Sequence, residues 1–169
     1  MRIILTRASS KHHSWIKTQL QIYLAELSQY APVKKNKHGL YLYPYLEHYW
    51  REPDRHAFVI EKNDDATGFL LVRKDLNPVD GTFINEIAEL YILPAFRQHS
   101  VATCVVKIVL SYFFGNWRVA VFRNNPTALS FWRNLIPNLD PNFTEKTSYS
   151  QKDQQIIFTF NGPNQLLGI

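Results

Sequence analysis

The segment from Glu89 to Val106 constrains the fold most strongly, because an apolar strand pattern passes through a short polar loop directly into an apolar helix pattern. The loop comprises Arg97, Gln98, His99, Ser100, Val101 and Ala102. A helix start exposes unpaired backbone N–H groups and the positive end of the helix dipole, so it can bind an anion such as phosphate. Ser100 and Ala102 are small enough to let a ligand approach the backbone, and Arg97 carries a fixed positive charge. The segment is either a phosphate-binding turn or an ordinary strand-to-helix turn capped by Ser100.

Hydrophobic patterns along the rest of the chain predict a mixed α/β protein. The expected strands cover residues 2–7, 56–61, 68–74, 83–93, 117–122, 143–148 and 155–160, and the expected helices cover residues 12–27, 45–51, 101–114 and 126–135. This order favours three layers. Turn residues at 63–68 predict an antiparallel hairpin, and Pro137 is expected in a loop after the last helix. With 169 residues we expect one domain, residues 1–160, and a C-terminal tail, residues 161–169.

The composition narrows the classes of protein that remain. The net charge is +5, but the densest basic run covers only residues 34–37, so nucleic-acid binding is not favoured. No apolar run approaches the ~18 residues that a membrane span requires, and we expect no secretory signal. The single cysteine, Cys104, excludes an intrachain disulfide and fits a cytoplasmic location. His12 and His13 lack further clustered ligands, so we expect no metal site.

Two motifs resemble signatures of the GNAT superfamily of acetyl-CoA-dependent N-acetyltransferases. Arg97-Gln98-His99-Ser100-Val101-Ala102, preceded by Ile92-Leu93-Pro94, is similar to motif A, which reads Arg or Gln, two residues, Gly, one residue, and Gly or Ala. Ser100 departs from the motif, because the family strongly favours glycine there; if the position requires a positive φ, serine is strained. Residues 125–132, NPTALSFW, are similar to motif B. Residues 41–55 resemble a poorly characterised bacterial branch of predicted acetyltransferases.

This resemblance implies a central, mostly antiparallel twisted sheet with helices on both faces. Acetyl-CoA would lie between two diverging strands, residues 86–93 and 117–122, with its pyrophosphate on the backbone of the polar loop beside Arg97. Its pantetheine arm would pair with the backbone of residues 90–92. Asn125 either contacts that arm or only caps a helix, and Phe131 and Trp132 either line the cofactor or pack in the core. The residues implied in binding acetyl-CoA are Leu90, Tyr91, Ile92, Arg97, Gln98, His99, Ser100, Val101, Ala102, Asn125, Phe131 and Trp132.

The carboxylates on the central strand are candidates for acid–base chemistry. Glu86 and Glu89 are three residues apart, so strand alternation predicts that they point to opposite faces of the sheet. Acetyl transfer to an amine requires the neutral amine, so a base is useful. We favour Glu89 as the base and keep Glu86 as the second candidate. The alternative for either carboxylate is an ion pair with an arginine such as Arg73 or Arg118.

The sequence leaves two further roles unassigned: the acid that protonates the leaving thiolate and the lining of the acceptor pocket. The family often uses a motif B tyrosine to protonate the leaving thiolate, but the corresponding residue here is Trp132, which is no acid. Tyr91 fills this role, or no acid is required. Tyr41, Tyr43, Tyr45, Tyr49 and Trp50 either line the acceptor pocket or pack a loop onto the sheet.

The sequence and the resemblance together predict an N-acetyltransferase that moves an acetyl group from acetyl-CoA directly to a primary amine of a small molecule or protein. The first alternative is a catalytically degenerate GNAT-fold module that binds acyl-CoA or regulates a partner. The second is a basic nucleic-acid-binding domain, for which the sequence displays no suitable face. Because GNAT proteins are often dimers, a homodimer is also expected.

Overall fold

A seven-stranded sheet forms the middle layer of the structure, a computed structural model that describes residues 2–77, 79–97, 100–149 and 154–163. The spatial order of the strands is β1-β2-β3-β4-β5-β7-β6. Only β4 and β5 run parallel; the other neighbours are antiparallel. The strands are β1 (Ile3–Arg7), β2 (Arg55–Lys62), β3 (Asp65–Leu76), β4 (Phe83–Ile92), β5 (Asn116–Phe122), β6 (Thr144–Tyr149) and β7 (Gln154–Asn161).

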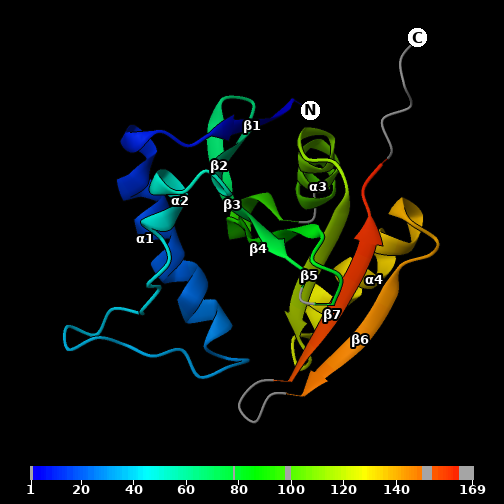
Figure 1. Cartoon of the computed structure of the whole chain (residues 1–169). Coiled ribbons are helices and arrows are strands. Elements are labelled where there is room, and N and C mark those ends of the chain that lie inside the picture. Colours follow the sequence, from blue (N-terminus) through cyan, green and yellow to red (C-terminus); the bar gives the residue numbers. More distant parts are fainter. Residues whose placement is uncertain (1, 78, 98–99, 150–153, 164–169) are drawn as a thin grey trace.

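Helices cover both faces of this sheet (Figure 1). Helices α1 (Ser10–Leu27) and α2 (His48–Arg51) pack on one face, and α3 (Val101–Tyr112) and α4 (Pro126–Leu139) pack on the other. Alternate strand residues supply two separate hydrophobic clusters, because successive side chains point to opposite faces: Phe69 packs beneath α1, whereas Leu70 packs beneath α3. The predicted mixed α/β fold, mostly antiparallel with helices on both faces, is confirmed.

The expected hairpin between β2 and β3 forms around a tight turn at Asn63 and Asp64. Both residues have positive φ, 52° and 72°, the geometry of a turn that suits the twist of a hairpin. The second strand begins at Asp65 and passes through Gly68. A Cβ at Gly68 would lie 2.1 Å from the Tyr91 carbonyl oxygen, so the close approach of β3 and β4 requires glycine at this position.

A β-bulge in β4 changes the direction of its side chains. Glu86 lies opposite Arg73 of β3, and Glu89 lies opposite Leu71, so the extra residue, Ala88, has no partner. A bulge inserts one residue into one strand and shifts the alternation. Glu86 and Glu89 therefore lie on the same face, the one covered by α1. The expectation that they point to opposite faces was wrong, because it assumed an uninterrupted strand.

The strands β4 and β5 pair over only a short length. Their register joins Ile84–Glu86 to Asn116–Arg118 and extends no further, and Figure 1 shows β4 and β5 diverging beyond it. Leu93 N–H donates to the Thr67 carbonyl over 2.8 Å, so alternation along the strand turns the backbone groups of Leu90 and Ile92 toward β5. The divergence thus leaves an edge of β4 that pairs with no other strand among the described residues.

Several element boundaries differ from the expectation. Helix α4 continues through Pro137 to Leu139. Pro137 lacks the N–H that a helix uses, but the Asn138 side chain donates to the Asn134 carbonyl over 2.7 Å and adds another hydrogen bond to this last turn. Helix α2 is shorter than the expected 45–51, and α3 ends at Tyr112. Strand β7 includes Asn161.

Candidate active site

The polar loop that follows β4 enters helix α3 through an unusual backbone conformation. Ser100 is the N-cap of α3, with φ 57° and ψ 13°, and its carbonyl accepts a hydrogen bond from Cys104 N–H over 3.0 Å. These angles lie in the left-handed α region, which explains why the motif favours glycine at this position. A residue with a side chain can adopt the same conformation at a cost of roughly 1–2 kcal/mol. Serine therefore adopts the backbone shape that the motif requires. Gln98 and His99 lie outside the described residues, so their contacts with phosphate stay predictions.

Arg97 connects this loop to helix α1. Its Nη2 donates to both carboxylate oxygens of Glu26, over 3.0 and 2.8 Å, and its Nε donates to the Ile92 carbonyl over 2.8 Å. The guanidinium also lies over the Tyr91 ring, 5.5 Å from its centroid. The arginine that was expected to face phosphate thus already has a carboxylate partner, and its contact with phosphate stays a prediction.

Glu89 lies on the diverging part of β4 beneath α1. Its carboxylate is partly buried and accepts a hydrogen bond from the Tyr23 hydroxyl of α1 over 2.6 Å. Burial raises its pKa to about 7, and the charge of Glu86 adds to this rise, whereas the hydroxyls of Tyr23 and Tyr43 and the charge of Arg73 oppose it. A base with a pKa near the working pH is well suited to proton transfer.

The neighbouring tyrosines remain hydrogen-bond donors. Burial, followed by the negative charge of Glu89, raises the pKa of Tyr23 and of Tyr43. Tyr49 is 3% exposed, and burial raises its pKa too. All three hydroxyls are therefore protonated at neutral pH. Of the expected pocket tyrosines, Tyr43 and Tyr49 lie near Glu89, Tyr45 is exposed, and Tyr41 binds Gln21 through its backbone.

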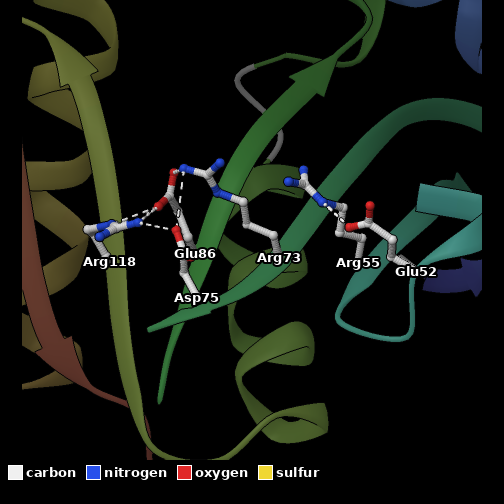
Figure 2. A network of polar contacts seen from close by, with 6 residues as sticks. All are labelled: Glu52, Arg55, Arg73, Asp75, Glu86 and Arg118. Atoms are coloured by element: carbon white, nitrogen blue, oxygen red, sulfur yellow. Dashed lines mark hydrogen bonds and ion pairs between the residues drawn. The ribbon is translucent and has the colours of Figure 1, made fainter. Parts of the chain in front are cut away.

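Glu86 has a different environment, that of an ion-paired carboxylate. It is 7% exposed and accepts from Arg73 Nη2 over 3.0 Å and from Arg118 Nε over 2.7 Å. Figure 2 shows its carboxylate between the two guanidinium groups. Asp75 extends the network to Arg118 over 3.2 Å. The predicted alternative, an arginine ion pair, is confirmed for Glu86.

The residues of the second motif take structural positions. The Asn125 side chain accepts from Ala128 N–H over 3.0 Å and caps α4. Trp132 is 6% exposed and belongs to the core, whereas Phe131 is partly buried at the edge of the core. Their rings meet edge to face, with centroids 4.9 Å apart. The helix cap and core packing are thus present, and the cofactor contacts of these residues stay predictions.

The sequence reasoning missed Tyr23 and Glu26. Both lie on α1, where Tyr23 fitted the apolar repeat of a helix that packs on a sheet. No local signal distinguishes a packing tyrosine from one whose hydroxyl binds a carboxylate 66 residues away. Within the described parts of the chain, no three His, Cys, Asp or Glu side chains form a group that could hold a metal ion. None of the helices described there has the length and apolar character needed to cross a membrane.

Comparison with solved structures finds the same fold in N-acetyltransferases. NAA60 of Arabidopsis thaliana, in complex with a bisubstrate analogue, has a TM-score of 0.64 and 12% identity, covering 96% of this chain and 100% of its own. Spermidine N-acetyltransferase from Vibrio cholerae, in complex with CoA and spermine, has a TM-score of 0.64 and 12% identity over 95% of each chain. The ribosomal-protein-S18-alanine N-acetyltransferase from Escherichia coli has a TM-score of 0.61 and 9% identity over 99% of each chain.

The chain thus shares its fold with solved acetyltransferases. The family model described as the acetyltransferase (GNAT) family matches residues 20–135. The chain therefore belongs to the GNAT family and is an acetyl-CoA-dependent N-acetyltransferase, as the motifs predicted. No curated protein matches the sequence. The proposed bacterial branch stays a prediction.

Proposed function

We propose that this enzyme transfers the acetyl group of acetyl-CoA directly to a primary amine within a ternary complex, with Glu89 as the general base. The observation that carries the proposal is the position of Glu89, a partly buried carboxylate with a raised pKa on the diverging part of β4. Burial without an arginine partner makes it a better proton acceptor at neutral pH than an ordinary carboxylate.

The diverging strands suit the shape of acetyl-CoA. The edge of β4 at Leu90 and Ile92 faces away from β3, so the backbone groups of Leu90 and the N–H of Ile92 are placed to hydrogen-bond to the pantetheine arm, whereas the Ile92 carbonyl accepts from Arg97. The α3 N-terminus at Ser100, Val101 and Ala102 supplies N–H groups and a positive dipole end for the pyrophosphate. Arg97 holds one side of this loop through Glu26 and the Ile92 carbonyl. These features support residues 90–92 and 100–102 as the acetyl-CoA site.

The chemistry follows from proton balance. An alkyl ammonium with a pKa of ~10 is protonated at neutral pH, so the amine must lose a proton before it attacks. Glu89 accepts that proton, directly or through a water molecule. The amine nitrogen then bonds to the thioester carbonyl carbon, the C–S bond breaks, and the coenzyme leaves as a thiolate. The acylated nitrogen releases its second proton, which passes through water to the thiolate and leaves a neutral amide and a thiol. A backbone N–H on the β4 edge stabilises the charge that develops on the carbonyl oxygen.

The leaving thiolate needs no dedicated acid in this scheme. Trp132 is buried and carries no acidic proton. The Tyr91 hydroxyl lies 3.4 Å from Glu26 on the α1 face, and burial, together with the charge of Glu26, raises its pKa. A thiol has a pKa of ~8.5, so the coenzyme leaves as a thiolate and then takes up, through water, the proton that the acylated nitrogen releases.

The acceptor is a primary amine of a small molecule or of a protein. The similar structures include a spermidine N-acetyltransferase and a ribosomal-protein-S18-alanine N-acetyltransferase. The shared fold therefore serves both small-molecule and protein acceptors. The surface beside Glu89 carries aromatic side chains: Tyr43, near the carboxylate, is partly exposed and Tyr45 is exposed, whereas Tyr49 is buried. Such a surface favours amines that carry apolar or aromatic groups next to the nitrogen.

The test is two-substrate kinetics. Coenzyme A release is measured while acetyl-CoA is varied at several fixed concentrations of each amine in a panel of polyamines, amino acids and short peptides with free N-termini. Direct transfer predicts intersecting double-reciprocal lines, whereas a covalent acetyl-enzyme gives parallel lines and contradicts the proposal. Tight acetyl-CoA binding without turnover on any amine would favour the degenerate binding module instead.

Arg97→Glu should weaken acetyl-CoA binding at least about tenfold, because it replaces a cation beside the phosphate loop by an anion. Calorimetric titration with acetyl-CoA measures the change. The matched control is Glu26→Gln, which breaks the same ion pair but keeps the arginine. If the two variants weaken binding equally, Arg97 acts only through its ion pair with Glu26 and not through phosphate.

A further inference from the structure

The polar network around Glu86 lies at the point where β4 and β5 separate. Glu86 and Arg118 form the last pair of the parallel register between these strands. Arg73 faces Glu86 from β3, and Figure 2 shows all three side chains meeting. Because one carboxylate receives charged partners from both neighbouring strands, the network joins β3, β4 and β5 at the point where the pairing of β4 with β5 ends.

We propose that Arg73, Glu86 and Arg118 are positioning residues for acetyl transfer, which keep Glu89 free of an ion-pair partner. The inference rests on the function proposed above, in which Glu89 is the base. It assigns Glu86 a role different from the catalytic one expected from the sequence, because its carboxylate is already bound by two guanidinium groups.

The β4 bulge creates the need for this arrangement. It places Glu86 and Glu89 on the same face as Arg73. Arg73 lies two residues from Leu71, the partner of Glu89 across the strands, so an uncommitted guanidinium there would pair with Glu89. Instead, Arg73 donates to Glu86 over 3.0 Å and also lies 3.9 Å from Asp75. Arg73, the cation whose charge lowers the pKa of Glu89, is thus held by other carboxylates.

The next arginine on this face is held in the same way. Arg55 lies directly opposite Arg73 in the β2–β3 register, and like charges in such positions repel. Arg55 donates to Glu52 over 2.9 Å, and its guanidinium lies over the rings of Tyr45 and Tyr49. Figure 2 shows the two arginines turned toward separate carboxylates. Neither arginine is left to neutralise Glu89.

The other groups that face Glu89 are mostly neutral donors. Tyr23 approaches from α1, Tyr43 from the segment between α1 and α2, and Tyr49 from α2, while Glu26 lies beyond Tyr23. Among the charges, Glu86 raises the pKa of Glu89 and Arg73 lowers it, although burial has the largest effect. Removing Glu86 and removing Arg73 should therefore move the pKa of Glu89 in opposite directions.

The experiment measures this pKa directly, by carbon NMR titration of the protein with ¹³C-labelled glutamate carboxyl groups; the Glu89 signal is assigned as the one missing in Glu89→Gln. Glu86→Gln should lower the pKa of Glu89 by about 0.5–1 unit, because it removes a nearby anion and frees Arg73. Arg73→Gln should raise it by a similar amount. In turnover assays, the acidic limb of kcat/KM should move in the same directions.

Two further variants keep the test decisive. Arg118→Gln leaves the Arg73–Glu86 pair intact but removes one of the two cations that neutralise Glu86. The stronger negative charge at Glu86 must then raise the pKa of Glu89, and this result is available even if Glu86→Gln fails to fold. Glu145→Gln is the matched control, because it breaks an ion pair with Arg133 of α4 and should not change the pKa of Glu89.

If Glu86→Gln and Arg73→Gln shift the pKa of Glu89 in the same direction, or shift it by less than the control does, the network is only structural and the inference fails. If the pKa shifts are opposite but no amine is acetylated, the network acts on Glu89 as inferred and the proposed function fails. The NMR titration thus distinguishes the two failures.

Discussion

The paired and the diverging parts of β4 carry one glutamate each, and the comparison between them explains the site. Glu86 and Glu89 share one strand and one face, yet Glu86 contacts two arginines and Glu89 contacts tyrosine hydroxyls. A carboxylate between guanidinium groups holds neighbouring strands together. One that is buried among neutral donors is a weaker acid and a better base. The two roles follow from the surroundings and not from the residue type.

The largest difference between the two parts should appear in turnover. Glu89→Gln should lower kcat at least about 100-fold with acetyl-CoA affinity unchanged, because it removes the proton acceptor and keeps the shape. Glu86→Gln should lower kcat less than about tenfold at the pH optimum. Steady-state kinetics and calorimetric titration of both variants check this. Equal losses in the two variants would mean that the two carboxylates act as one unit.

The free energy of unfolding should show the reverse order, with the larger loss in Glu86→Gln and the smaller in Glu89→Gln. Glu86→Gln should destabilise the fold by about 2 kcal/mol, because it leaves Arg73 and Arg118 without their carboxylate. Glu89→Gln should leave stability at pH 8 unchanged or raise it, because the neutral amide avoids burying a charge. Urea unfolding at pH 8 measures both free energies. A larger loss for Glu89→Gln would show that its tyrosine hydrogen bonds support the fold more than its burial opposes it.

The tyrosine environment of Glu89 predicts a smaller effect. Tyr23→Phe removes a hydroxyl that lowers the pKa of this carboxyl group, so the pKa should rise by about 0.5–1 unit. Because only ionised Glu89 accepts the proton, the acidic limb of kcat/KM should move to higher pH. The matched control is Tyr41→Phe, whose hydroxyl contacts Ser28. A profile that does not move in Tyr23→Phe would mean that another group is the base.

The turn at Ser100, which leads from the diverging strand into α3, should be the least sensitive to substitution. Ser100→Gly relieves a left-handed serine, but glycine also makes the unfolded chain more flexible. The two effects oppose each other, so we expect a stability change within about 1 kcal/mol and an acetyl-CoA affinity within about threefold of the original. Thermal unfolding and calorimetric titration check this. A large gain in affinity would show that the serine side chain obstructs the phosphate.

Much of this fold could be predicted from local patterns. The order of strands and helices, the hairpin near Asn63 and the helix start at Asn125 depend on short-range hydrogen bonds and on hydrophobic repeats. The bulge at Ala88 could not be predicted, because it is a property of the pairing between β3 and β4. Pro137 was misplaced because the helix that contains it is held by its packing on the sheet, which a proline-based rule does not consider.

The sequence by itself determined the enzyme class, because the phosphate-loop motif and the helix start after it are local. It also supplied both carboxylates. The tertiary structure decided which of them is held by arginines and which is free. That choice depends on Tyr23 from α1, Arg73 from β3 and Arg118 from β5, which are distant along the chain. The pKa of a carboxyl group is set by the charges and burial around it, and only the folded chain brings these together.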